Sequence, residues 1–375
     1  MRVCVIGNGV AGSMVAERLS IRSLVVTLYT EEPYGFYSRI KLPQLLCDET
    51  ALRALPSLRE APYLVHKAVR KIDRQKQELL LAGGETTHYD FLVLATGSRG
   101  RILEAFADTK GVSTLRTLED ALLIGQTITD PVVVLGGGLL GLEAALAIMR
   151  KGYSVTVCEG SPHILGRQLN AQASKLLRTQ LESDGLVIHE NVKATGKRVD
   201  KEGRIEALLA EDREPIACKT LILSLGVNTE TTLAKDANLE VDRGIVVDEK
   251  LRTSDEHIFA IGDCAQYKGQ VPGILPVAIG MAQSVMATLL GETKDYIPPV
   301  LMTRFKDEKL GIVSVGDVSG KSTNKLKDGR YEAYFVDEGR LIGAILYGNT
   351  ENMAFMRSRY LKAVTTEEIA ELLSF

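Results

Sequence analysis

The chain has 375 residues, of which 45% are hydrophobic and 25% charged, and its net charge is −3 at neutral pH. This length exceeds what one hydrophobic core usually organises, so two or three domains are expected. The near-neutral charge and the lack of a long basic run exclude a general electrostatic affinity for nucleic acid or an anionic membrane. The N-terminus opens on a strand-like run without the regions of a signal peptide, and a cytoplasmic location is therefore expected.

The first predicted elements form a strand–turn–helix unit. A strand at 3–6 leads into Gly7-Asn8-Gly9-Val10-Ala11-Gly12 and a helix-like stretch, and a second strand follows at 24–29. In this context the first glycine allows a tight turn, the second lets the backbone approach a pyrophosphate, and the third allows close helix–strand packing. Farther along, a strand at 91–94 leads into Ala95-Thr96-Gly97. The pattern predicts a βαβ dinucleotide-binding unit.

The same landmarks recur later in the chain. A strand at 132–135 leads into Gly136-Gly137-Gly138-Leu139-Leu140-Gly141, a helical run and a strand at 154–158, and the strand at 220–225 ends at Gly226. Gly7 and Gly136, like Gly97 and Gly226, are 129 positions apart. This register predicts two similar domains and two bound dinucleotides. The apolar window 131–149 approaches membrane-spanning length, but Glu143 and four glycines inside it favour the turn and helix, so no membrane span is expected.

The end of each unit's second strand carries the residue that can accept hydrogen bonds from an adenosine ribose. In the second unit this residue is Glu159, whose charge suits free hydroxyls and would repel a 2′-phosphate, so NADH is expected rather than NADPH. In the first unit the equivalent residue is Thr30, and Glu31 or Glu32 could replace it from one or two positions later. The choice among the three stays open.

Together these motifs resemble the two-dinucleotide flavoprotein reductases, the pyridine nucleotide-disulfide oxidoreductase superfamily, over essentially the whole chain. The stretch 253–265 matches the second FAD signature of that family, in which Asp263, after Gly262, holds the flavin ribityl chain. The run 276–283, which contains Val277, resembles the family helix whose N-terminus faces the flavin pyrimidine. The resemblance is closest to NADH:rubredoxin reductases and to the related flavin modules of nitrite reductases and ferredoxin reductases.

The resemblance implies further cofactor contacts. Segment 32–42 resembles an element that places Arg39 and Lys41 along the FAD phosphates or near the isoalloxazine, although Ile40 and Pro43 depart from its pattern. Glu143 matches a glutamate near the flavin and nicotinamide. The complete set of expected cofactor-binding residues is Gly7, Gly9, Val10, Ala11, Gly12, Thr30, Glu31, Arg39, Lys41, Val69, Ala95, Thr96, Gly97, Arg116, Gly136, Gly138, Leu139, Leu140, Gly141, Glu143, Glu159, Gly226, Gly262, Asp263, Val277 and Lys306.

The implied fold class is α/β, with two Rossmann-like dinucleotide-binding domains and a small α+β C-terminal domain. The FAD landmarks at Gly7 and Asp263 bracket the NADH landmarks, so the NADH domain is expected to be inserted in the FAD domain. In the last part of the chain, strand segments at 309–315, 331–336 and 341–347 precede a helix-like run. We expect an FAD-binding domain at 1–108 and 229–294, an NADH-binding domain at 109–228 and a C-terminal domain at 295–375.

The five cysteines, Cys4, Cys47, Cys158, Cys218 and Cys264, are scattered and show neither a Cys-x-x-Cys motif nor the spacing of zinc ligands. No metal site is expected. Disulfide reductases relay electrons through two nearby cysteines, and related peroxide or coenzyme A disulfide reductases use one near the flavin. Neither pattern is present: Cys47 fits a helix-packing residue, and Cys264 is the second choice for a reactive thiol. Electrons are therefore expected to leave the flavin directly.

We predict an FAD-dependent enzyme that takes a hydride from NADH and reduces a small redox carrier protein of the rubredoxin or ferredoxin type. Positioning of the nicotinamide against the flavin requires no dedicated acid–base residue, so none is assigned as catalytic. A monomer or a homodimer is expected. Two alternatives stay open: an NADH oxidase that reduces oxygen directly, and a non-catalytic FAD- and NADH-binding module in redox signalling.

Overall fold

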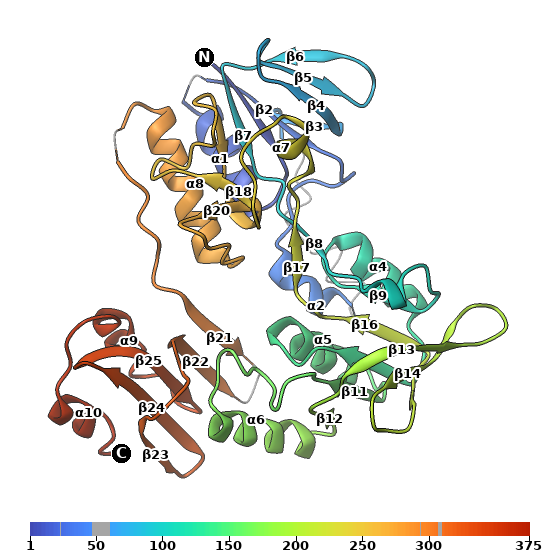
Figure 1. Ribbon diagram of the computed structural model, residues 1–375, viewed down its shortest axis with the longest axis vertical. Coiled ribbons are helices and arrows are strands. Elements are labelled where there is room, and N and C mark those ends of the chain that lie inside the picture. The colour runs from blue at the N-terminus through green and yellow to red at the C-terminus, as the bar shows by residue number, and fades with distance from the viewer. Residues whose placement is uncertain (23, 47–60, 293, 307–309) are drawn as a thin grey trace. The chain divides into compact units, whose positions relative to one another are not determined.

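The computed structural model describes residues 1–22, 24–46, 61–292, 294–306 and 310–375, and Figure 1 shows its elements. The chain forms two compact units, and each of them contains segments from distant parts of the sequence. The first unit comprises Met1–Arg101, Arg116–Leu118 and Gly226–Pro299, and the second comprises Ile102–Leu115, Glu119–Leu225 and Val300–Phe375.

A five-stranded parallel sheet in the order β19-β7-β1-β2-β3 forms the centre of the first unit. At its centre, the residues 3–6 of β1 and 92–94 of β7 are apolar and buried, as is typical of parallel strands covered on both faces. Helices α1 and α8 pack against each other beside this sheet (Figure 1). The bounds are β1 Arg2–Ile6, β2 Val25–Thr30, β3 Leu64–His66, β7 Phe91–Leu94, β19 Ile258–Ala260, α1 Val10–Ser20 and α8 Leu275–Leu289.

Smaller elements complete the first unit. An antiparallel sheet of β4, β5 and β6 lies in sequence between β3 and β7, and the antiparallel pair β8–β17 joins the segments where the chain leaves the unit and returns to it. The bounds are β4 Val69–Asp73, β5 Glu78–Leu81, β6 Thr86–His88, β8 Ser98–Gly100, β17 Val227–Thr229, β18 Ile245–Val247, β20 Ala265–Tyr267, η1 Arg39–Lys41, α2 Leu42–Leu45, α7 Thr232–Asp236 and η3 Gly262–Cys264.

The second unit repeats this plan. Its parallel sheet has the order β12-β11-β10-β16-β9, and the first four of these strands correspond to β3-β2-β1-β7 of the first unit. In the sequence, a three-stranded antiparallel sheet precedes β16, as another precedes β7. The sequence landmarks predicted the repeated βαβ unit but not the two small antiparallel sheets. The bounds are β9 Val112–Thr114, β10 Val132–Leu135, β11 Val155–Cys158, β12 Val187–His189, β13 Ala194–Val199, β14 Ile205–Ala210, β15 Ile216–Ala217, β16 Thr220–Leu223, η2 Glu104–Phe106, α4 Leu118–Thr127, α5 Leu139–Met149 and α6 Ala171–Ser183.

The apolar window 131–149 forms β10, the glycine turn and α5, as predicted. Its strand is fully buried, and six of the residues of α5 are buried as well. Among the helices of the described residues, none is long and apolar enough to cross a membrane.

The last part of the chain forms an antiparallel sheet in the order β21-β22-β25-β24-β23, with two short helices against it (Figure 1). The predicted strands at 331–336 and 341–347 are present as β24 and β25. Strand β23 was missed because its side chains are mostly exposed and polar, which leaves no apolar alternation. The bounds are β21 Met302–Lys306, β22 Gly311–Gly316, β23 Thr323–Lys327, β24 Arg330–Asp337, β25 Arg340–Tyr347, α9 Met353–Arg359 and α10 Thr366–Leu372.

Candidate cofactor sites

The first glycine turn connects β1 to α1 and has no room for side chains at two positions. Gly7 has a φ of +108°, and a Cβ atom there would lie 2.1 Å from the backbone oxygen of Ala95. A Cβ atom on Gly12 would lie 2.0 Å from the backbone oxygen of Gly7. The close packing of β1, α1 and the end of β7 therefore requires glycine at both positions.

Gly9 has a different role in this turn. It is the N-cap of α1, in extended conformation, and no side chain caps the helix there. The first amides of the helix, at Val10, Ala11 and Gly12, therefore have no partner within the helix, and the helix dipole adds positive potential. Such a helix start is suited to bind a phosphate group.

Arg39 lies beside this helix start. Its Nη1 atom is 3.3 Å from the position that a Cβ atom on Gly9 would take, and its Nη2 atom donates to Oε1 of Glu32 at 2.6 Å. Its Nε atom is buried and has no hydrogen-bond partner among the described residues. A buried guanidinium donor without a hydrogen-bond partner among the described residues, next to a helix start that is suited to a phosphate group, fits an anionic ligand. Lys41, two residues later, is exposed.

The three candidates for the first adenosine ribose have different surroundings. Thr30 is buried, and its hydroxyl accepts a hydrogen bond from the amide of Glu32 at 3.2 Å. Glu32 is paired with Arg39. Glu31 is 61% exposed and forms an ion pair with Arg99 at 3.1 Å. Of the three side chains, that of Glu31 is the most accessible to a ligand.

Asp263 and Arg116 lie together although they are 147 positions apart in the sequence. The Nη2 atom of Arg116 donates to Oδ2 of Asp263 at 2.5 Å, and both side chains are less than one-fifth exposed. Ser98 joins them: its hydroxyl accepts from Arg116 at 2.7 Å and donates to Asp263 at 3.1 Å. Ser98 was not predicted as a site residue, and its only signal in the sequence is its place directly after Thr96-Gly97.

The second glycine turn repeats the geometry of the first. Gly136 has a φ of +118°, and a Cβ atom there would lie 2.2 Å from the backbone oxygen of Ser224. A Cβ atom on Gly141 would lie 2.1 Å from the backbone oxygen of Gly136. A Cβ atom on Gly138, the N-cap of α5, would meet no atom within 4 Å. This helix start, which continues into Leu139 and Leu140, is therefore also open to a ligand.

Glu159 lies against this turn, as its position predicted. Its Oε2 atom accepts a hydrogen bond from the amide of Gly137 at 2.6 Å, and its Oε1 atom accepts one from the amide of Ser161 at 2.7 Å. The carboxylate is thus fixed beside the N-terminus of α5, where an adenosine ribose would lie in a dinucleotide-binding βαβ unit.

The chain thus contains two glycine turns of the same geometry, each between a buried strand and a helix. Comparison with known proteins identifies a family with such turns. The model of the pyridine nucleotide-disulphide oxidoreductase family matches residues 1–282. The chain belongs to this family. The match confirms the predicted superfamily, and the similar solved structures agree with the predicted α/β fold class with two Rossmann-like domains.

Individual members of the family are similar over most of the chain. The rubredoxin-NAD(+) reductase of Pseudomonas putida is 32% identical over 346 residues, which cover 87% of this chain and 89% of that protein. The nitrite reductase [NAD(P)H] of Bacillus subtilis (strain 168) is 28% identical over 391 residues, 99% of this chain and 48% of that protein. The chain thus spans about half the length of this relative. A crystal structure of a ferredoxin reductase from Rhodopseudomonas palustris has a TM-score of 0.89 at 28% identity, over 99% of this chain and 97% of that one.

The remaining expected contacts of this family member lie on several elements. Gly97 and Gly226, which answer to each other in the two units, have φ values of +73° and +85°. The hydroxyl of Thr96 donates to the backbone oxygen of Glu230 at 2.6 Å. Val69 is buried in β4, Val277 is buried in the first turn of α8, Gly262 begins η3, and Lys306 ends β21 in the second unit.

Glu143 is partly buried within α5, and burial raises the pKa of its carboxyl group to about 6. Its pKa in the unfolded chain is lower, so the folded state binds more protons between pH 4.5 and 6. The stability that this group contributes is fully present below about pH 4.5 and is lost as the pH rises through about 6.

We expect Glu143→Gln to be more stable than the wild type at pH 7.5, by roughly 1 kcal/mol once the partial exposure of the group is discounted, with little difference at pH 4.5. Thermal unfolding of both proteins across this pH range measures the difference. A constant difference in melting temperature at all pH values would show that Glu143 does not titrate with a raised pKa.

The four described cysteines are buried thiols. Burial raises the pKa of Cys4 and Cys158 to about 12 and that of Cys218 to about 11. Burial also raises the pKa of Cys264, whose sulfur donates to the backbone oxygens of Leu94 and Ile261. None of these four is therefore poised as a thiolate. Cys47 lies outside the described residues.

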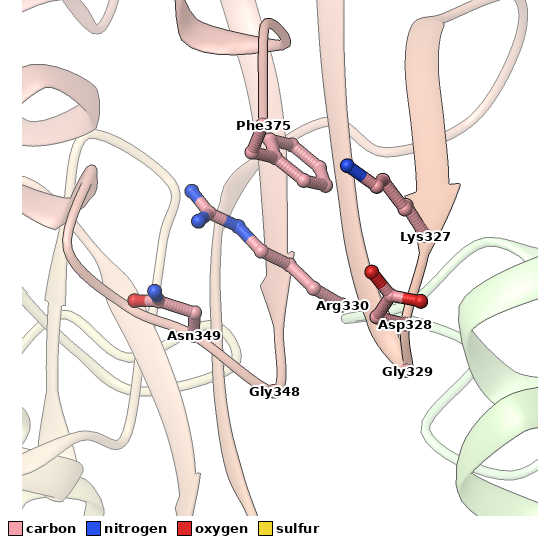
Figure 2. Close-up of a pocket in the computed structure, with 7 residues that line it drawn as sticks. All are labelled: Lys327, Asp328, Gly329, Arg330, Gly348, Asn349 and Phe375. Atoms are coloured by element: carbon pink, nitrogen blue, oxygen red, sulfur yellow. The ribbon is translucent and has the colours of Figure 1, made fainter.

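A separate pocket of about 420 Å³ lies at the end of the C-terminal sheet (Figure 2). There the guanidinium of Arg330 lies 4.0 Å from the centre of the Phe375 ring and is also paired with Glu332, which is fully buried. Because the charge of Arg330 is already neutralised, this pocket is assigned no cofactor. Its lining residues are Lys327, Asp328, Gly329, Arg330, Gly348, Asn349 and Phe375.

Proposed function

We propose that the protein is an NADH-dependent flavoprotein reductase that passes electrons from FAD to a small redox carrier protein of the rubredoxin or ferredoxin type. The observation that carries this proposal is the presence, in one chain, of two glycine turns of the kind that binds dinucleotides. The hydrogen-bonded group of Asp263, Arg116 and Ser98 in the first unit supports it. The names of the Pseudomonas rubredoxin-NAD(+) reductase and of the Rhodopseudomonas ferredoxin reductase support a carrier protein as the acceptor.

The residues of the first unit fit FAD. The start of α1 and the guanidinium of Arg39 would hold the diphosphate, which would give the buried Nε atom a partner. Asp263 would hold the ribityl chain, because a carboxylate accepts hydrogen bonds from a polyol. The start of α8, where no side chain caps the helix, would face the flavin. FAD, when bound, can accept two electrons from NADH and release them one at a time to the acceptor.

The residues of the second unit fit NADH. The start of α5 would bind the diphosphate, and Glu159 would accept hydrogen bonds from the adenosine ribose and disfavour a 2′-phosphate. The expected domain boundaries remain part of the proposal: FAD-binding at 1–108 and 229–294, NADH-binding at 109–228, and a C-terminal domain at 295–375.

The buried thiols favour direct electron transfer from the flavin over a thiol relay. Steady-state NADH oxidation with rubredoxin, ferredoxin or oxygen as the acceptor tests this part of the proposal. We expect at least one carrier protein to raise the turnover well above that with oxygen alone. Stoichiometric oxygen consumption that no carrier accelerates would instead identify an NADH oxidase.

A second candidate function follows from the length of the curated relatives. Because the chain spans about half of the Bacillus nitrite reductase, the same unit could supply electrons to a metal centre in another part of a larger reductase. In that case neither rubredoxin nor ferredoxin would accelerate turnover, whereas a purified partner with such a centre would.

We expect Asp263→Asn to weaken FAD binding about tenfold, because the variant loses a charged acceptor and leaves the guanidinium of Arg116 without its partner charge. Fluorescence titration of the apoprotein with FAD measures this. Glu85→Gln is the control, since Glu85 pairs with Lys67 at 2.6 Å in the same unit and outside the proposed site. Equal FAD affinity of the Asp263 variant and the wild type would remove Asp263 from the site.

A further inference from the structure

Among the places where the chain passes from one compact unit to the other is a segment of three residues, called here the crossover segment. Ile102–Leu115 and Glu119–Leu225 belong to the second unit, whereas Arg116, Thr117 and Leu118 belong to the first. Strand β9 ends shortly before this crossover segment, and α4 begins at its last residue. The segment therefore enters the first unit only briefly, and its place in that unit depends on the contacts that it makes there.

Hydrogen bonds attach the crossover segment to the first unit at both of its ends. At one end, Arg116 is bound to Asp263 and, through its Nη2 and Nε atoms, to the hydroxyl and the backbone oxygen of Ser98. At the other end, the amide of Leu118 donates to the hydroxyl of Tyr37 at 3.1 Å. Leu118 is 1% exposed and starts α4, so its amide has no partner within the helix and water does not reach it. The Tyr37 hydroxyl satisfies this buried donor.

Tyr37 also contacts the proposed phosphate site. Its ring lies 5.5 Å from the guanidinium carbon of Arg39, the residue beside Gly9. Tyr37 is 4% exposed, and burial raises the pKa of its hydroxyl to about 12, so the group is protonated at neutral pH. Tyr37 thus contacts both Arg39 and the crossover segment.

We propose that Tyr37 is a positioning residue for flavin reduction: its hydroxyl fixes Leu118, and through the crossover segment it keeps Arg116 on Asp263 at the place of the flavin ribityl chain. This inference rests on the proposed function. Without the hydroxyl, the buried amide of Leu118 has no acceptor, and the segment shifts to find one. Small displacements of groups that orient reactants slow a reaction strongly even when the cofactor remains bound.

The test compares Tyr37→Phe with the wild type and with Tyr34→Phe, all as the FAD-containing protein. Tyr34 lies in the same segment but contacts the glycine turn through its backbone oxygen, which accepts from the side chain of Asn8, so its variant keeps that contact. For Tyr37→Phe we expect unchanged FAD content, an unchanged apparent dissociation constant for NADH, and a limiting rate of flavin reduction about tenfold lower. The Tyr34 variant is expected to behave as the wild type.

Hydrogen exchange of the Leu118 amide measures the attachment independently of NADH. We expect this amide to exchange about tenfold faster or more in Tyr37→Phe. Faster exchange with an unchanged limiting rate would overturn the positioning role, as would a lower rate that only follows lost FAD. If the Leu118 amide exchanges at the same rate in Tyr37→Phe as in the wild type, the Tyr37 hydroxyl does not hold the crossover segment. Failure of NADH to reduce the wild-type flavin would overturn the proposed function, and the inference with it.

Discussion

Replacing Gly138 with alanine is expected to raise the apparent dissociation constant for NADH about 30-fold while the melting temperature and the FAD content stay as in the wild type. A Cβ atom at this N-cap meets no protein atom within 4 Å, so the fold tolerates it. The same methyl group would occupy the space through which the backbone approaches the pyrophosphate. A steric loss of about 2 kcal/mol corresponds to this change in affinity. The NADH dependence of flavin reduction measures it.

Gly141→Ala is the matched contrast on the same turn. Its Cβ atom would lie 2.1 Å from the backbone oxygen of Gly136, so α5 must move away from β10. Such overpacking costs about 1–3 kcal/mol of folding free energy. We therefore expect a clearly lower melting temperature for this variant. If Gly138→Ala binds NADH as the wild type does, or is destabilised as much as Gly141→Ala, the described role of this turn is wrong.

Replacing Glu159 is expected to change the choice between NADH and NADPH. Glu159→Arg removes a repulsive charge and supplies a partner for the 2′-phosphate, and we expect the NADPH-to-NADH ratio of kcat/KM to rise about 100-fold. Part of the effect will be a loss of NADH activity, because the carboxylate also accepts hydrogen bonds from Gly137 and Ser161. Glu159→Gln keeps an acceptor oxygen and should raise the ratio about tenfold through the loss of charge alone.

The matched control for this prediction is Glu190→Gln. Glu190 also lies near the loop after β11, where it accepts from the amide of Ile164 and pairs with Arg178, but it makes no recorded contact with the glycine turn. Its variant should keep the wild-type preference for NADH. If the Glu159 variants keep that preference as well, Glu159 does not determine whether a free or a phosphorylated adenosine ribose binds.

The sequence alone was sufficient to locate the two glycine turns because backbone packing demands them. At Gly7, Gly12, Gly136 and Gly141 a Cβ atom would come within about 2 Å of a backbone oxygen, and this steric requirement leaves a fixed spacing in the chain. Glu159 could be placed on its turn for the same reason, since it follows the second strand of the unit.

Other parts of the site left no such pattern. The contacts of Ser98 with Asp263 and of Tyr37 with Leu118 join residues from distant segments, and neither residue type nor spacing indicates them. The strand β23 at the edge of the last sheet is mostly polar and exposed, so periodicity does not reveal it. A local sequence pattern indicates neither contacts between segments that are distant in the chain nor a polar strand at the edge of a sheet.

The most direct test of the central claim is to mix the purified protein, saturated with FAD, with NADH in the absence of oxygen and to follow the flavin absorbance by stopped flow. We expect rapid bleaching, with a limiting rate in the usual enzyme range of about 1 to 1,000 per second, and reoxidation of the flavin when an oxidised carrier protein is added. A protein that binds no FAD, or whose flavin NADH does not bleach, would contradict it.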